Sequence, residues 1–415
     1  MRMTLVRILL SALALLSLAI GGPAAARQEE PKWVATWGSA QQEPEPHNAL
    51  PPGTLDDATL RQLVRTTLAG DRIRIRVSNA FGKGPLAIRG VHVARAADPA
   101  SPRIDPATDR TVTFAGASQL VVPAGADYVS DPVDLAVPAL ATLAVSIHVA
   151  RQPAVQTGHP GSRATSWVGR GDQLAAAEIS APTRVDHWYL LSGIDVLAGT
   201  RESAIAILGD SITDGFGVKP NTNSRWTDFL AERLQASPRT RRLSVVNLGL
   251  GGNRLLNDGL GPNAAARFER DVLARSGVGT LIVFEGVNDL GTLTRDAAAT
   301  PEQHGALVAE MIAAYAQIVA KARERGIRVI GATILPYGGS SYYHPDAANE
   351  ADRQAINAWI RAPGHFDAVI DFDAEMRDPA RPDRLRPDLD SGDGLHPSIE
   401  GYRAMAAAVP LALLR

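Results

Sequence analysis

The sequence of 415 residues contains no cysteine. Disulfide bonds, zinc sites with cysteine ligands and thiol catalysis are therefore excluded. Without cross-links the folded chain must be stabilised by its core, and a chain of this length can bury a large one.

A surplus of positive charge is also absent. Lys and Arg number 42 against 44 Asp and Glu, the formal net charge is −2 at pH 7, and there is no long block of like charge. This balance gives no indication of nucleic-acid binding. The 37 glycines and 28 prolines are spread along the chain, which argues against low-complexity disorder.

Long apolar runs are absent except at the start of the chain. Arg2 and Arg7 precede the run ILLSALALLSLAI, and three small residues follow, ending at Ala26. This order predicts a secretory signal peptide over residues 1–26, and therefore a secreted or periplasmic protein with no stable membrane insertion after cleavage. The alternative is an uncleaved anchor, but the run is shorter than the roughly 20 residues that a bilayer span needs.

The length favours two domains. Residues 27–199 are predicted to form an all-β sandwich or jelly-roll-like domain and its connection, because short alternating segments end in Gly, Pro or Asp. The clearest segment is RIRIRVSN, residues 72–79. From 151 to 199 the pattern is mixed, and we expect a connection that contains some strand.

Residues 200–415 are predicted to form an α/β domain. Near-continuous apolar runs alternate with amphipathic helical patterns, which indicates a parallel sheet with helices on both faces. We therefore expect a three-layer α/β sandwich. The apolar runs lie at residues 203–209, 242–249, 279–286 and 327–336.

Three of these runs end in unusual polar turns, and a fourth polar stretch lies near the C-terminus. In open α/β sheets ligands bind at the carboxyl ends of the strands, so we expect the turns to converge. The four segments are GDSITDG (209–215), NLGLGGNRL (247–255), EGVNDLG (285–291) and DSGDGLHPSIEGY (390–402).

If they converge, they supply the groups for acyl transfer. The hydroxyl of Ser211 is a weak nucleophile that needs a base, and His396 can serve as one. Asp393, three residues earlier, can hold the imidazole in one tautomer. Each piece alone has a simpler interpretation, since a serine in such a turn is more often a helix cap.

The same chemistry needs donors for the oxyanion of the tetrahedral intermediate. The candidates are the backbone N–H groups of Ser211 and Gly252 and the side-chain amide of Asn288. Glycine at 252 leaves the backbone open to approach. The alternative interpretations are a tight turn at Gly252 and a turn or cap at Asn288.

The Gly-x-Ser-x-Gly elbow of α/β-hydrolases is missing, because Thr213 stands in the place of the second glycine. Taken together, the four segments resemble the SGNH (GDSL-type) hydrolase superfamily instead. The matching blocks, in family order, are Gly209-Asp210-Ser211, Asn247-x-Gly249-x-x-Gly252, Gly286-x-Asn288-Asp289 and Asp393-x-x-His396.

The resemblance implies a flavodoxin-like fold with a shallow, exposed site. It also implies a role for each matching residue. Ser211 is the nucleophile, Asp393 and His396 complete the triad, and Ser211, Gly252 and Asn288 form the oxyanion hole. It implies neither a cofactor nor a metal.

The segments WVATWGSAQ and DSGDGLHPS look like a bacterial subgroup of secreted esterases that includes arylesterases and acetylxylan esterases. That resemblance implies hydrolysis of acetyl or other short acyl esters, on small molecules or on plant polysaccharide such as xylan. The alternatives are a lipase, lysophospholipase or thioesterase with a longer acyl preference, and an inactive carbohydrate-binding protein. The oligomeric state is left open.

Further residues near these turns have weaker signals. Arg254 and Asn257 follow the second turn and are candidates for substrate contact. The loop 336–352, rich in Gly and aromatic residues, is a candidate wall of the pocket. Asp210 and Asp214 flank the nucleophile, and we expect both to cap the following helix.

Two further groups of residues are set aside. Asp371 and Asp373 lie in a strand-like segment where alternation would put them on one face, which leaves a metal as a minor alternative. Trp33, Trp37, Trp167 and Trp188 are expected in the core rather than on a sugar ring.

Overall fold

The computed structural model describes residues 31–414, so the predicted signal peptide lies outside the described residues. Fourteen strands, β1 to β14, come before the first strand of the parallel sheet. We call residues 32–198 the β region and residues 203–414 the α/β region. Both belong to one compact unit that begins at Pro31.

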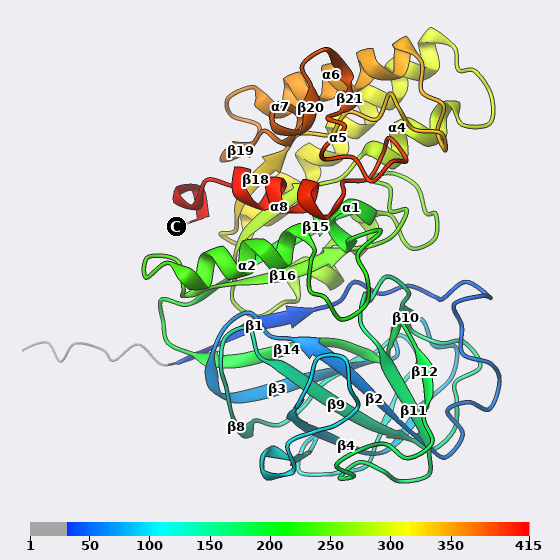
Figure 1. The fold of residues 1–415 in the computed structure, drawn as a ribbon, viewed down its shortest axis with the longest axis vertical. Helices are drawn as coiled ribbons and strands as arrows, with labels where there is room; N and C mark the ends of the chain where they lie inside the picture. The colour runs from blue at the N-terminus through cyan, green and yellow to red at the C-terminus, as the bar shows by residue number, and fades with distance from the viewer. Residues whose placement is uncertain (1–30, 415) are drawn as a thin grey trace, which may run out of the picture. The chain divides into compact units, whose positions relative to one another are not determined.

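The β region consists mainly of two antiparallel sheets (Figure 1). The first has the order β1(Lys32–Gly38), β14(Leu191–Ala198), β3(Gly70–Ser78), β7(Asp127–Val129), with β8(Val133–Val137) also on β3. The second has the order β12(Thr183–Val185), β11(Ser166–Arg170), β2(Ala58–Arg65), β9(Thr142–Val149), β4(Leu86–Arg95), β5(Arg110–Val112), with β6(Leu120–Val122) also on β4. A small two-stranded sheet joins β10(Gly158–His159) and β13(Trp188–Tyr189).

The alternation of arginine and apolar residues accounts for strand β3. Ile73, Ile75 and Val77 are fully buried, while the arginines between them are not. The pattern thus predicted this strand and its inward face. It indicated less about β14, which we expected within a connection. β14 instead lies between β1 and β3, with Ile194 paired to Ile75.

The α/β region contains a parallel five-stranded sheet of order β16(Leu243–Gly249), β15(Ser203–Gly209), β17(Val278–Phe284), β18(Arg328–Ala332), β19(Ala368–Ile370). In chain order this is 2-1-3-4-5, the order of flavodoxin-like sheets. β15 has a parallel neighbour on each side, and its side chains from Ala204 to Leu208 are fully buried. That burial explains its uninterrupted apolar sequence.

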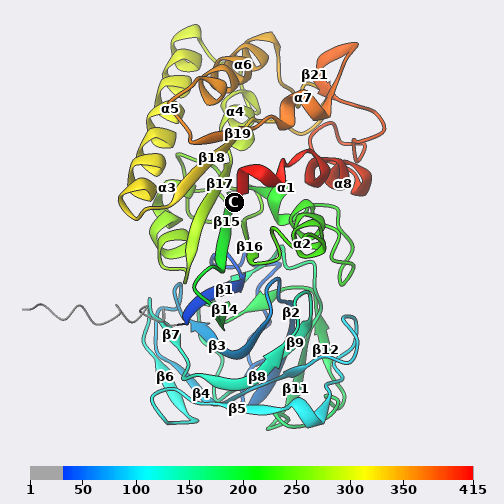
Figure 2. The same cartoon turned by 90° about the vertical axis from the view of Figure 1, so that its left-hand side faces the viewer.

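Helices lie on both sides of this sheet. Figure 2 shows α3 and α5 on one side and α2 and α8 on the other. The helices are α1(Ser211–Asp214), α2(Trp226–Ala236), α3(Ala264–Phe268), α4(Val287–Thr294), α5(Pro301–Glu324), α6(Ala347–Arg361), α7(Phe372–Met376) and α8(Ile399–Ala408), with a π-helical turn at Glu269–Leu273 and short 3-10 turns at Pro106–Thr108 and Leu411–Leu414.

Helix α5, with 24 residues, is the one described helix that is long and apolar enough to cross a membrane, judged by length and composition only. It packs against α6 and β18, and the buried Tyr315 hydroxyl donates to the carbonyl of Glu285 at 2.7 Å. We interpret it as a helix of the folded domain.

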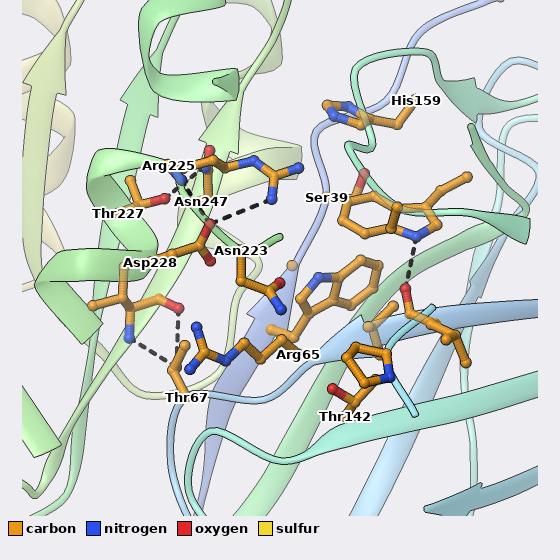
Figure 3. A pocket seen from close by; sticks show the side chains of 18 of the residues that line it. Ser39, Arg65, Thr67, Thr142, His159, Asn223, Arg225, Thr227, Asp228 and Asn247 are labelled. Atoms are coloured by element: carbon orange, nitrogen blue, oxygen red, sulfur yellow. Dashed lines mark hydrogen bonds and ion pairs between the residues drawn. The ribbon is translucent and has the colours of Figure 1, made fainter. Parts of the chain in front are cut away.

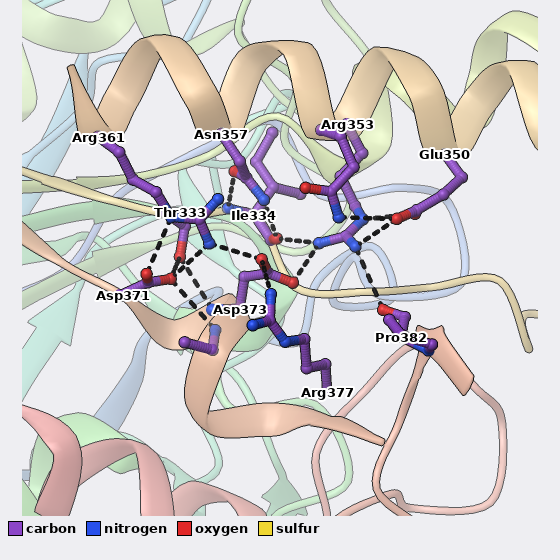
Figure 4. Close-up of polar contacts among 12 residues, drawn as sticks. Thr333, Ile334, Glu350, Arg353, Asn357, Arg361, Asp371, Asp373, Arg377 and Pro382 are labelled. Carbon is purple, nitrogen blue, oxygen red and sulfur yellow. Dashed lines mark hydrogen bonds and ion pairs between the residues drawn. The ribbon is translucent and has the colours of Figure 1, made fainter. Parts of the chain in front are cut away.

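The segment after β19, which contains Asp371 and Asp373, differs from the prediction. The strand ends at Ile370, and Asp371 caps α7 by accepting from the N–H of Ala374. Asp373 is fully buried in α7 and accepts from Arg353 and Arg361, each at 2.6 Å (Figure 4). The strand prediction was therefore wrong. The arginines neutralise the negative charge of Asp373, for which a metal had been an alternative.

The β region packs directly on the α/β region. Strand β1 lies beside β16 (Figure 1). The Ser244 hydroxyl donates to the carbonyl of Ala35 at 2.6 Å, and the N–H of Val245 donates to Thr67 Oγ1 at 3.0 Å. A narrow cavity of about 60 Å³ lies between the two regions, with His159 and Arg225 in its lining (Figure 3).

Candidate active site

The turn after β15 places Ser211 at the first position of α1. Gly209 ends the strand, and the carboxylate of Asp210 caps the helix by accepting from the N–H of Ile212 at 2.9 Å. Asp210 is therefore the cap that we expected. The end of β16 approaches this helix so closely that a Cβ on Gly249 would lie 2.3 Å from the Asp214 nitrogen. Only glycine fits there.

Ser211, His396 and Asp393 form a continuous hydrogen-bonded chain. Ser211 Oγ lies 2.9 Å from His396 Nε2, and His396 Nδ1 lies 2.7 Å from Asp393 Oδ2. The sequence separates the serine and the histidine by 185 residues. The structure thus brings together the three side chains that the motifs singled out.

The Asp393 carboxylate is held in its ionised form. Partial burial acts against ionisation, but hydrogen bonds from the His396 ring and from the N–H groups of His396 and Leu395 lower its pKa overall. An ionised carboxylate only accepts, so His396 Nδ1 must carry the proton. Nε2 then presents a lone pair to the hydroxyl of Ser211.

The face of the imidazole packs against Phe216. The two ring centroids lie 4.1 Å apart with an interplanar angle of 26°. Tyr402 in α8 fixes this segment by donating to the carbonyl of Phe216 at 2.8 Å. No pattern in the sequence predicts this contact, because Phe216 and His396 are 180 residues apart.

The other two oxyanion candidates, Gly252 and Asn288, lie with Ser211 around one cavity of about 540 Å³. Gly252 has the left-handed φ of 65° that favours glycine. The amide of Asn288 is oriented by two contacts: its nitrogen donates to the carbonyl of Asn253 at 2.7 Å, and its oxygen accepts from Tyr343 at 2.6 Å. One N–H of Asn288 remains after these contacts.

The rest of the cavity combines apolar and cationic side chains. Phe216, Leu260 and Tyr342 line it and are 45%, 55% and 58% exposed. Three arginines, Arg163, Arg254 and Arg295, line it as well. Ser340, Tyr342 and Tyr343 come from the loop 336–352, so this loop forms a wall of the pocket as expected, and Arg254 also lies where we expected it.

Behind the nucleophile, acidic side chains are buried around Arg267. Burial is the main cause that raises the pKa of Asp210 to about 7 and that of Asp289 to about 6. Arg267 is itself buried and donates to the carbonyls of Gly209 and Leu248 at 3.0 and 2.8 Å. It thus ties the ends of β15 and β16 together, a role that its position in a helical pattern did not indicate.

Asp214 differs from the expectation. It is the last residue of α1 and does not cap it. Its Oδ1 lies 2.8 Å from Nε2 of His159, a residue of the β region that had no signal in the sequence. The β region therefore contacts the helix that carries Ser211.

A hydrogen-bonded serine–histidine–aspartate chain at the carboxyl ends of a parallel sheet is the arrangement of a serine hydrolase. Residues 207–404 match the model of the GDSL-like lipase/acylhydrolase family. Those residues thus form a domain of the GDSL-like lipase/acylhydrolase type.

Two solved structures to which the chain is similar are an acetylxylan esterase and a GDSL-like lipase. An acetylxylan esterase from Geobacillus stearothermophilus, solved as a catalytic mutant, is 23% identical, with a TM-score of 0.38 over 51% of this chain and 93% of its own. A GDSL-like lipase from Bacteroides thetaiotaomicron is 20% identical, with a TM-score of 0.38 over 52% of this chain and 89% of its own. No curated protein matches the chain.

Proposed function

We propose that the protein is a serine esterase that hydrolyses short-chain acyl esters, with Ser211 as nucleophile, His396 as general base and acid, and Asp393 as the orienting carboxylate. The observation that carries this proposal is the hydrogen-bonded chain of 2.9 and 2.7 Å from Ser211 through His396 to Asp393. It supplies each group that serine needs to attack an ester.

The reaction has two steps. Ser211 Oγ attacks the ester carbonyl carbon while its proton moves to His396 Nε2, and the resulting oxyanion accepts hydrogen bonds from Ser211 N–H, Gly252 N–H and Asn288. The carbon–oxygen bond to the alcohol then breaks, and His396 returns the proton to the leaving alcohol. Water attacks the acyl-enzyme by the same route and releases the acid and the serine hydroxyl.

Ser211→Ala tests the proposal. The variant should keep its fold, because Asp210 rather than Ser211 caps α1, and the single hydrogen bond that the hydroxyl makes with His396 contributes about 1 kcal/mol. Turnover of 4-nitrophenyl acetate should fall to the background rate, with circular dichroism and thermal unfolding as checks on folding. Wild-type turnover by Ser211→Ala would overturn the assignment.

Short acyl groups on carbohydrate are the substrates that we propose. The rim of the cavity is exposed and carries the aromatic rings of Phe216 and Tyr342, which suit sugar faces. Acetate release from acetylated xylan, pectin and xyloglucan, measured side by side, tests this choice.

The exposed Leu260 beside the two aromatic rings favours a second candidate, an esterase for longer acyl chains. A series of 4-nitrophenyl esters separates the two. A rate that collapses beyond butyrate supports the first, and a maximum at octanoate or longer supports the second.

We also propose export by the signal peptide at residues 1–26. The mass of the mature protein recovered from the native host should then correspond to a chain that begins at Arg27. A mature chain that retains Met1 would contradict cleavage.

A further inference from the structure

Arg163 lies in the loop between β10 and β11 of the β region and lines the same cavity as Ser211 and His396. Its φ is 47°, a left-handed conformation that non-glycine residues rarely adopt. The carbonyl of Arg163 accepts from the N–H of Asn221 at 2.8 Å, and Arg225 donates to the carbonyl of the preceding Ser162. Because such strain persists only where the surroundings enforce it, the loop holds this arginine in one place.

In the part of the chain that the structure describes, the guanidinium of Arg163 has no acceptor. Among residues 31–414 its side chain makes no hydrogen bond and no ion pair within 4.0 Å, and its Nε is buried without a partner. Its carbon Cζ lies 5.9 Å from the ring centroid of Phe216, the residue that packs on His396. The cation therefore lies beside the ring that packs on His396, and the donors of its two terminal nitrogens have no partner among the described residues.

The other two arginines that line the cavity have hydrogen-bond acceptors within the chain. Arg254 donates to the carbonyl of Asp258, and Arg295 donates to Asp296 and to Tyr342. The carboxylate in the cavity lining, that of Asp393, is already bound by His396.

Asp214 is the acid behind Arg163, and it does not satisfy the guanidinium either. It forms no ion pair with Arg163, and His159 occupies its Oδ1 at 2.8 Å. Within residues 31–414, no side chain therefore competes with a ligand for the terminal nitrogens of Arg163.

We propose that Arg163 binds a carboxylate on the ester substrate, so that the β region gives the enzyme a preference for anionic esters. A guanidinium matches a carboxylate with two parallel hydrogen bonds, and such charged bonds are stronger than neutral ones. This inference rests on the proposed esterase function and specifies its substrate class. The carboxylate can belong to the alcohol, as in a uronic acid, or to the acyl group, as in a half-ester of a dicarboxylic acid.

Two matched pairs of esters distinguish these sources. 4-Acetoxybenzoate and its methyl ester differ by a charge on the alcohol side. Mono-4-nitrophenyl succinate and its methyl ester differ by a charge on the acyl side. For one pair, wild-type kcat/KM should be about 10- to 100-fold higher for the acid than for the methyl ester, the range expected from one or two charged hydrogen bonds.

Arg163→Gln should bring this acid-to-methyl-ester ratio close to one, and Arg163→Lys should retain part of it. Arg170→Gln is the matched control, because Arg170 is an exposed arginine of the β region outside the cavity lining. It should leave the ratio at the wild-type value.

A wild-type enzyme with no preference for either acid would overturn the inference, even if Arg163→Gln failed to fold. A preference that survives in Arg163→Gln would overturn it too. Neither outcome contradicts the proposed esterase function, which fails only if Ser211→Ala retains turnover of the neutral esters.

Discussion

His159 Nε2 lies 2.8 Å from Asp214 Oδ1, and this buried pair connects the β region to the one-turn helix that carries Ser211. The other ring nitrogen of His159 lies 2.7 Å from the carbonyl of Ala40. Burial disfavours ionisation of Asp214, but the charge and hydrogen bond of His159 and the charges of two arginines lower its pKa overall. Both ring nitrogens of His159 therefore face oxygen atoms, one of a carboxylate and one of a carbonyl.

His159→Phe should cost about 3–5 kcal/mol in the free energy of unfolding, because it leaves a buried carboxylate without its partner. It should also lower kcat, since α1 positions Ser211. Urea unfolding at pH 7 and steady-state kinetics measure the two effects. His187→Phe is the matched control, because His187 makes one hydrogen bond to a backbone carbonyl, and its loss should cost about 1 kcal/mol. Equal losses in the two variants would contradict the ion pair.

Asp210→Asn should remove part of the pH dependence of stability. The pKa of Asp210 is raised to about 7 in the folded state against about 3.9 when unfolded. Its contribution to stability is therefore complete below about pH 4 and is lost as the pH rises to about 7. Asn resembles the protonated acid and does not ionise. Between pH 4 and 8, the free energy of unfolding should therefore decrease by on the order of 2–4 kcal/mol less in the variant than in the wild type.

Urea unfolding at the two pH values measures this difference. Asp71→Asn, at an exposed position of the β region, should follow the wild-type curve. Parallel curves for Asp210→Asn and wild type would show that Asp210 is ionised throughout.

Asp393→Asn should lower kcat by about 10⁴-fold, because the amide favours the wrong tautomer of His396. Asp390→Asn is a control in the same turn. Asp390 Oδ1 accepts from the N–H groups of Gly392 and Gly394, and an asparagine oxygen can do the same. Hydrolysis of 4-nitrophenyl acetate by both variants is the measurement. A loss below about 100-fold for Asp393→Asn would indicate that another group orients the imidazole.

Asn288→Ala should lower kcat by about 100- to 1000-fold with little change in KM, as expected for a donor that acts on the oxyanion. Tyr343→Phe keeps Asn288 but removes the hydroxyl that donates to its amide oxygen. The decrease in kcat for this variant should be smaller than that for Asn288→Ala. If the two variants lost activity equally, or if Asn288→Ala raised KM instead, Asn288 would be a structural residue.

The convergence of the turns around Ser211 could be predicted because the topology of a parallel sheet determines where the strand ends meet. Residues that follow parallel strands meet at one edge, so Ser211, Gly252 and Asn288 follow from three apolar runs and their polar turns. His396 follows from the resemblance and from Asp393 three residues before it. The alternation in β3 likewise predicted which side chains face the core.

Other residues could not be predicted, because their partners are set by packing between distant segments. His159 meets Asp214 across 55 residues, and neither lies in a periodic pattern that points at the other. Arg163 is one arginine among many until the loop places it in the cavity. Asp371 and Asp373 were misassigned because a three-residue strand followed by a one-turn helix has the same apolar spacing as a longer strand.

The contact of β1 with β16 has a consequence for any attempt to shorten this enzyme. Strand β16 ends the parallel sheet, and the hydroxyl of Thr67 covers a backbone N–H of Val245 there. A fragment that began at Ser203 would uncover that edge, and an open apolar edge strand recruits other chains. We expect such a fragment to self-associate, so a minimal catalyst derived from this chain would need a redesigned β16.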